Sequence, residues 1–112
     1  LMKDLKQSTK QRFTAFDFDY PDAALETQIV AKETGMDESV AAQLVKIGGV
    51  ARNLKGHGLD EGISTRLLVY AATLIKDGVA PRDACRMALV RPITDDADIR
   101  ETLDHAIDAT FA

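Results

Sequence analysis

The sequence predicts a mainly α-helical fold, a small bundle of about five helices that follows a single β-strand. Apolar residues recur at steps of three and four over most of residues 21–112, which is the period of an amphipathic helix. Glycine and proline residues separate these stretches, as they do at helix ends. Residues 13–20 are instead rich in aromatic residues and alternate between aromatic and acidic side chains from Phe16 to Tyr20, which is the period of a strand. At 112 residues, the chain has the size of one domain.

The alternating segment is the only strand candidate in the sequence. Phe16, Phe18 and Tyr20 would share one face of it, and Pro21 would end it. A single strand does not make a sheet, so sequence alone does not say what this strand pairs with.

Local signals place the ends of the five expected helices. Pro21 and Asp22 begin the first helix, where Asp22 and Glu26 suit the positive end of its dipole. The other boundary signals are Gly35 at the end of the first helix, Asp37 at the start of the second, Ser64 and Gly78 at the two ends of the third, Pro81 and the Arg91–Pro92 pair at those of the fourth, and Thr94 with Asp95 before the fifth.

Each expected helix carries an apolar stripe that should face one common core. The stripes are Leu25, Ile29 and Val30; Val40, Leu44, Ile47, Ala51 and Leu54; Leu67, Leu68, Ala71, Leu74 and Ile75; Ala84, Met87 and Ala88; and Ile99, Leu103, Ala106, Ile107 and Phe111. Gly48 and Gly49 interrupt the second stripe, and we expect them to let another element approach closely.

Composition and motifs exclude several functions. The formal net charge of −4 argues against nucleic-acid binding through bulk charge or a helix-turn-helix. The single cysteine, Cys85, allows no intrachain disulfide and suits a reducing compartment. No apolar run is long enough for a membrane span. His57, Cys85 and His105 are far apart in sequence, so no metal site is expected, and residues 95–98 are interpreted as an acidic helix start.

The most informative local feature is the segment from Gly62 to Arg66. It delivers Ser64, Thr65 and Arg66 to the start of a helix, where free backbone N–H groups and the dipole attract anions. An arginine opposes the dipole there, unless an anion such as phosphate binds between them. The alternative is that Ser64 only caps the helix and that Arg66 pairs with an acidic residue at position 60 or 61.

Arg12 is a second candidate, because it stands between a basic segment and the expected strand. Such a residue is either solvated surface or an arginine that reaches the phosphate of a neighbouring molecule.

Three blocks of the chain carry a family resemblance. They are LKQSTKQRF at residues 5–13 followed by DFDYP at 17–21, LKGHGLDEG at 54–62 running into STRLLVYAA at 64–72, and PITDD at 92–96. In these blocks the chain resembles the CbbQ/NorQ/NirQ branch of the MoxR-type AAA+ ATPases, over nearly its whole length.

The resemblance implies an organisation and a set of roles. Residues 1–20 would be the end of an α/β core, including its final strand, and residues 21–112 the C-terminal helical lid. Arg66 would be the sensor 2 arginine, with Ser64 and Thr65 beside the nucleotide. Arg12 would be the arginine that reaches the nucleotide of a neighbouring subunit. The Walker A and Walker B segments would lie before Leu1, so the segment alone is expected to be inactive and to bind no cofactor tightly.

For the full-length protein, the resemblance implies a cytoplasmic ATPase that uses ATP and Mg²⁺ and assembles as a homo-oligomeric ring, a hexamer. Its partners would be a von Willebrand A domain protein and a client metabolic enzyme such as Rubisco or nitric oxide reductase. The competing hypothesis is a self-contained helical interaction module with no nucleotide role. A GxxxxGK[ST] phosphate loop encoded upstream in the parent gene would decide for the ATPase.

Overall fold

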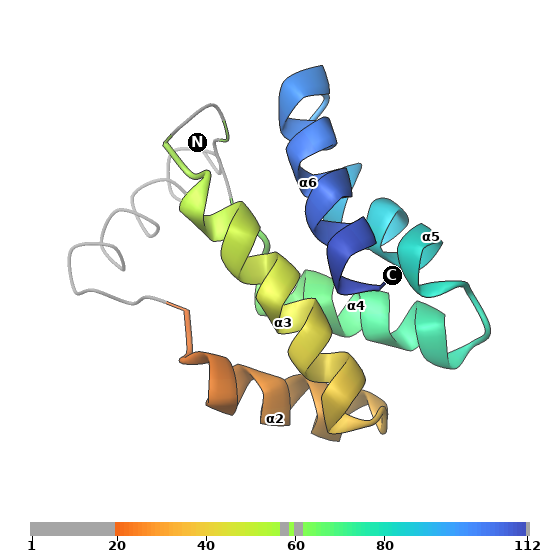
Figure 1. Cartoon of the computed structure of the whole chain (residues 1–112). Helices are drawn as coiled ribbons and strands as arrows, with labels where there is room; N and C mark the ends of the chain where they lie inside the picture. The colour runs from red at the N-terminus through yellow and green to blue at the C-terminus, as the bar shows by residue number, and fades with distance from the viewer. Residues whose placement is uncertain (1–19, 57–58, 60–61, 112) are drawn as a thin grey trace, which may run out of the picture.

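The computed structural model of the chain describes residues 20–56, 59 and 62–111 (Figure 1). Of the strand expected at residues 13–20, only Tyr20 belongs to this part. Arg12 lies outside it. The described elements are α2 (Ala23–Thr34), α3 (Glu38–Asn53), α4 (Thr65–Lys76), α5 (Pro81–Cys85), η1 (Arg86–Val90) and α6 (Ala97–Thr110). Because η1 continues α5 without a break, the described part holds the five helices that the sequence predicts.

Helices α3 and α4 form the middle of the bundle. Helix α2 packs on both of them, α6 packs on α3, and the α5–η1 stretch packs on α4. Figure 1 accordingly shows α2 and α6 on opposite sides of α3. The core therefore follows the α3–α4 pair, and α2 and α6 each cover part of it.

Most helix ends fall where short-range signals place them, although the Asp37 side chain makes no capping hydrogen bond at the start of α3. The Asp22 side chain accepts a hydrogen bond from the Leu25 N–H at 2.8 Å, and Gly35 ends α2 with a positive φ of 75°. Ser64 is the cap of α4, and Pro81 opens α5. The start of α6 differs from the prediction by one or two residues, because Asp96 and not Thr94 or Asp95 caps it, through the N–H groups of residues 98 and 99.

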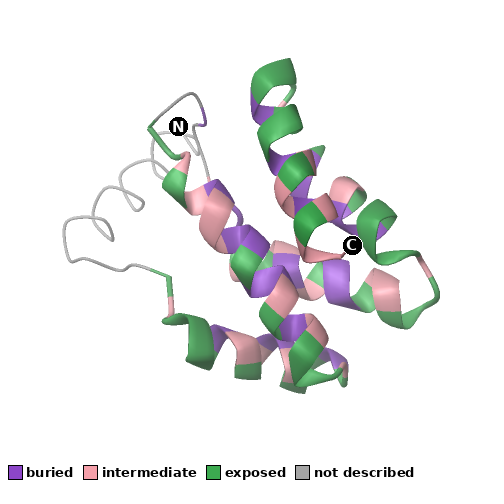
Figure 2. Ribbon diagram, viewed as in Figure 1, coloured by how far each residue is buried: buried purple, intermediate pink, exposed green. Residues whose placement is uncertain are grey.

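The predicted stripes of α3, α4 and α6 face the core, whereas that of α2 was partly misassigned. Figure 2 shows buried and exposed positions alternating along each helix. Leu25 is 49% exposed, while its neighbour Glu26 is fully buried. Met87, expected in the core, is 40% exposed. Glu26 shares the face of Val30, one turn later, and a partner described below makes its burial possible.

Gly48 lets α3 and α4 approach closely, as expected. A Cβ atom at this buried position would lie 3.4 Å from both terminal carbons of Leu68 on α4. Gly49 differs, because a Cβ there would meet no atom of the described residues within 4 Å. Packing therefore leaves room for a side chain at Gly49 but little room beyond a methyl group at Gly48.

The stretch from Arg86 to Val90 is a π-helix, which the sequence did not predict. The Arg91 N–H donates to the Arg86 carbonyl oxygen five residues earlier, at 3.1 Å. Cys85, just before it, is fully buried, and burial raises the pKa of its thiol to about 12 although Arg86 opposes the rise. The thiol therefore stays protonated and packs as a small apolar group.

Helices α2 and α4 run parallel and are joined at both ends. At their C-terminal ends the Lys76 ammonium donates to the Thr34 carbonyl oxygen at 2.8 Å. At their N-terminal ends the Thr65 hydroxyl donates to the Glu26 carboxylate at 2.6 Å. None of the described helices has the length and apolar character needed to cross a membrane.

We predict opposite effects of substitution at the two adjacent glycines. Gly49→Ala should raise the unfolding free energy by about 0.5–1 kcal/mol, because alanine favours a helix interior and the site has room. Gly48→Val should lower it by about 1–3 kcal/mol, because its methyl groups would enter the space of Leu68. Urea denaturation of both variants measures the two changes, and stabilisation by Gly48→Val would contradict the close packing of α3 and α4.

Candidate functional site

The start of α4 carries three of the residues selected from the sequence. Ser64 caps the helix, and its hydroxyl oxygen accepts from the Leu67 N–H at 3.3 Å. Thr65 and Arg66 lie in the first turn, which contains no acidic residue of its own. Arg66 therefore adds a positive charge at the positive end of the helix dipole.

Arg66 is exposed at this helix start. No described carboxylate forms an ion pair with it. Positions 60 and 61, which supply the alternative acidic partners, lie outside the described residues. Arg12 lies outside them as well, so the structure gives no distance between the two candidate arginines.

Beneath the helix start lies an ion pair between α2 and α3 that the sequence did not reveal. Glu26 is fully buried, and the Arg52 guanidinium binds its carboxylate with two parallel hydrogen bonds, Nη1 to Oε1 at 2.5 Å and Nη2 to Oε2 at 2.7 Å. The Thr65 hydroxyl donates to the same Oε2. Both carboxylate oxygens are thus occupied, as a buried charge requires. We call Glu26, Arg52 and Thr65 the clamp.

Arg52 also reaches the loop that leads into α4. Its Nε donates to the Ile63 carbonyl oxygen at 2.9 Å. The Tyr20 ring covers the guanidinium, with Cζ 3.6 Å from the ring centroid. A Cβ atom on Gly62 would come within 3.1 Å of both the Tyr20 hydroxyl and the Arg52 Cγ, so a larger residue there would require these side chains to shift. Ile63 and Leu59 anchor the loop, being 0% and 2% exposed.

The clamp decides the charge state of its carboxyl group. Burial alone would raise the pKa of Glu26, but the hydrogen bonds from Arg52 and Thr65 and the charge of Arg52 together hold it below its usual value. Glu26 is therefore ionised at neutral pH, and the pair is a true ion pair in a buried place.

Of the predicted candidates, Thr65 thus has its hydroxyl proton engaged inside the protein, while Arg66 presents its charge outward. The clamp residues were missed because Glu26 was assigned to the dipole of α2. One signal was present: Glu26, Val30 and Thr34 stand four residues apart and share one face of that helix. Nothing in the sequence pairs Glu26 with Arg52, 26 residues later.

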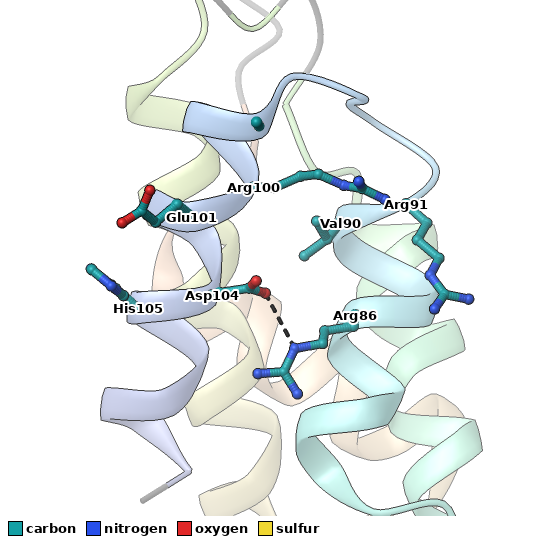
Figure 3. Close-up of a pocket in the computed structure, with 8 residues that line it drawn as sticks. Arg86, Val90, Arg91, Arg100, Glu101, Asp104 and His105 are labelled. Atoms are coloured by element: carbon teal, nitrogen blue, oxygen red, sulfur yellow. Dashed lines mark hydrogen bonds and ion pairs between the residues drawn. The ribbon is translucent and has the colours of Figure 1, made fainter.

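A second group of charges lines an open groove of about 530 Å³ between η1 and α6 (Figure 3). Arg86 reaches across from η1 and binds Asp104 and Asp108, each at 3.2 Å. Glu101 and His105 point away from Arg86 in Figure 3. The arginine at the base of the groove is therefore already paired, and the group joins two elements of the bundle.

In the described part of the chain, no three His, Cys, Asp or Glu side chains lie together in a way that could hold an ion. Cys85 is buried on α5 and His105 is exposed on α6. The acidic residues before α6 serve as its start, since Asp96 binds two backbone N–H groups.

The fold and the α4 start define a small helical domain with an exposed, positively charged helix end. Residues 26–110 match the family described as CbbQ/NirQ/NorQ C-terminal, and the chain belongs to that family. The resemblance noted from the sequence blocks is thereby confirmed.

Three curated relatives show how much of a longer protein the chain corresponds to. Protein CbbQ of Hydrogenophilus thermoluteolus is 60% identical over 111 residues, which are 99% of this chain and 42% of that protein. Protein NorQ of Paracoccus denitrificans is 45% identical over 111 residues, or 99% and 41%. Denitrification regulatory protein NirQ of Pseudomonas aeruginosa is 52% identical over 96 residues, or 86% and 37%. The chain thus spans about two fifths of the length of these relatives.

We predict that breaking the clamp lowers stability strongly at neutral pH. Glu26→Gln should lower the unfolding free energy by about 3 kcal/mol at pH 7, because it leaves Arg52 inside with no counter-charge. Glu26 has a lower pKa folded than unfolded, so its charged form stabilises the fold above about pH 4.3, and this contribution is lost as the pH falls through the folded value. The gap between wild type and variant should therefore shrink in acid.

Urea denaturation between pH 3 and pH 7 measures this gap, and Glu33→Gln is the matched control. Glu33 is exposed on the same helix, so its substitution should change the unfolding free energy by less than about 0.5 kcal/mol. Equal stability of Glu26→Gln and wild type at pH 7 would contradict the clamp.

Proposed function

We propose that the chain is the nucleotide-sensing helical lid of an AAA+ ATPase of the CbbQ/NorQ type. Residues 1–20 would be the end of the α/β core and residues 21–112 the lid. The observation that carries the proposal is the exposed Arg66 in the first turn of α4, a turn without an acidic side chain, in a chain that belongs to this family.

The physics of the helix start supports phosphate as the ligand. Backbone N–H groups and the positive end of the dipole attract an anion, and a guanidinium offers two parallel donors to phosphate oxygens. An arginine in this place opposes the dipole until an anion binds. Arg66 would bind the γ-phosphate as sensor 2, with the Ser64 hydroxyl beside it. The Thr65 hydroxyl already donates its hydrogen bond to Glu26, so Thr65 would contribute through its place in the first turn and not through a hydrogen bond to the phosphate.

Arg12 is proposed to act across a subunit boundary. In a ring, its guanidinium would reach the nucleotide of the neighbouring subunit and stabilise the charge that develops on the transferred phosphoryl group. ATP and Mg²⁺ would bind mainly to the core, which supplies the phosphate loop. The ring would be a homo-oligomer, a hexamer, in the cytoplasm.

The relatives include proteins whose name describes a regulatory role. One of them is described as a denitrification regulatory protein. We propose that ATP hydrolysis in the full-length protein activates or matures such a client, either Rubisco or nitric oxide reductase, together with a partner that carries a von Willebrand A domain. The lid would transmit the nucleotide state to the ring.

The proposal predicts where ATPase activity resides. The full-length protein should release phosphate from Mg-ATP, whereas these 112 residues alone should release none above a buffer blank, because they hold no phosphate loop. A phosphate-release assay on both tests this directly. If the 112-residue chain hydrolyses ATP, and substitutions within it abolish that activity, the assignment of ATPase activity to the rest of the full-length protein would be wrong.

Substitution of the two candidate arginines should have different effects in the full-length ring. Arg66→Ala should weaken ATP binding by about tenfold or more, because a charge-assisted contact to phosphate is lost. Arg12→Ala should leave binding nearly intact and slow hydrolysis by about a hundredfold or more, as loss of an arginine finger does. Calorimetric titration and phosphate release separate the effects. Unchanged hydrolysis in Arg12→Ala would remove its assignment.

A further inference from the structure

The clamp fixes the backbone on both sides of the cap of α4. Arg52 holds the Ile63 carbonyl, one residue before Ser64, and Glu26 holds the Thr65 hydroxyl, one residue after it. The same ion pair therefore holds the entry to the helix and its first turn. Arg66 is the next residue along the chain.

The pair has little freedom to rearrange. The guanidinium uses Nε for the loop and both terminal nitrogens for the carboxylate, so its plane is fixed by three hydrogen bonds. Tyr20 covers that plane on one face. Among the described residues, no buried side-chain nitrogen or oxygen lacks a partner. A buried pair with all its hydrogen bonds made favours this geometry, because a rearrangement that broke these bonds would leave the buried Glu26 charge unpaired.

Stability alone does not explain an ion pair in this place. Well-packed apolar residues of similar volume often hold a protein together as well as a buried ion pair does. Apolar residues form no directional hydrogen bonds, so they would not orient the Ile63 carbonyl and the Thr65 hydroxyl on either side of the helix cap. The clamp instead sets where the first turn of α4 begins and how it is rotated.

We propose that Glu26 and Arg52 are positioning residues, which hold the start of α4 so that Arg66 is directed at the bound nucleotide. This inference rests on the proposed function, because it assumes that Arg66 binds phosphate. Glu26 itself is fully buried and so cannot touch a ligand. Its effect on nucleotide binding must therefore pass through the helix start.

A double-mutant cycle in the full-length protein tests the inference. The affinity for Mg-ATP is measured by calorimetry for wild type, Glu26→Gln, Arg66→Ala and the double variant, below the melting temperature of the least stable one. Glu26→Gln should weaken binding by about threefold to tenfold. The double variant should bind within about twofold of Arg66→Ala, because residues that act through one contact are not additive.

Two further variants guard the cycle against a merely structural explanation. Thr65→Val removes the hydroxyl that joins the Glu26–Arg52 ion pair to α4 but leaves that ion pair, and should reproduce the loss of affinity if Glu26→Gln fails to fold. Thr65→Ser keeps a hydroxyl at this position and should therefore bind Mg-ATP with nearly the affinity of the wild type. Arg86→Gln breaks the ion pairs with Asp104 and Asp108 elsewhere in the bundle, and should lower the melting temperature without changing affinity.

The outcomes separate the two proposals. If Arg66→Ala leaves affinity unchanged, Arg66 does not bind the nucleotide, and both the sensor assignment and this inference fail. If Arg66→Ala weakens binding but the effect of the clamp variant adds to it in full, the sensor assignment stands and the positioning role is wrong. The positioning role is equally wrong if Arg86→Gln lowers affinity as much as Glu26→Gln does.

Discussion

The buried ion pair between Glu26 and Arg52 is the interaction on which one half of the bundle depends. It joins α2 to α3, and through Ile63 and Thr65 it also holds the loop and the start of α4. Taking two charges out of water is costly, and only a complete set of hydrogen bonds offsets the cost. The bundle supplies that set from three separate parts of the chain, so none of them can shift alone.

The same constraint explains how one small domain can hold an exposed helix start in a fixed place. Exposed loops and helix ends are ordinarily the parts of a protein with the least local stability. Here the loop before α4 is anchored by two buried side chains, Leu59 and Ile63, and by the guanidinium of Arg52. At the other end of α4, Lys76 binds the last carbonyl of α2. Helices α2 and α4 are thus braced against each other along their length.

Sequence reasoning succeeded where the cause of a feature was local. Helix α2 ends at Gly35, because glycine accepts the positive φ of that position. Helix α4 starts at Ser64, because the serine hydroxyl caps the helix. Both boundaries were predicted. The placement of Arg66 in an exposed first turn follows from the same cap. Its chemical role remains a proposal, and the strand expected before Pro21 lies outside the described residues.

Sequence reasoning failed where the cause of a feature lay far away in the chain. Whether Leu25 or Glu26 faces the core depends on Arg52, which is brought near only by the fold. A charged residue is assigned to the surface by any local rule, because burial without a partner is prohibitive. The π-helix at residues 86–90 was missed as well, and it packs against α4 and α6, which no local sequence pattern indicates.

That π-helix has a consequence for how the length of this protein could vary. An α-helix turns about 100° per residue, so a one-residue deletion normally rotates everything that follows onto another face. Cys85 and Val90 are both buried although five residues apart, because the wider turn between them absorbs one residue. A chain that is one residue shorter between them could form an ordinary α-helix with both side chains still facing inward. This segment is thus a place where the chain can lose a residue and keep its register.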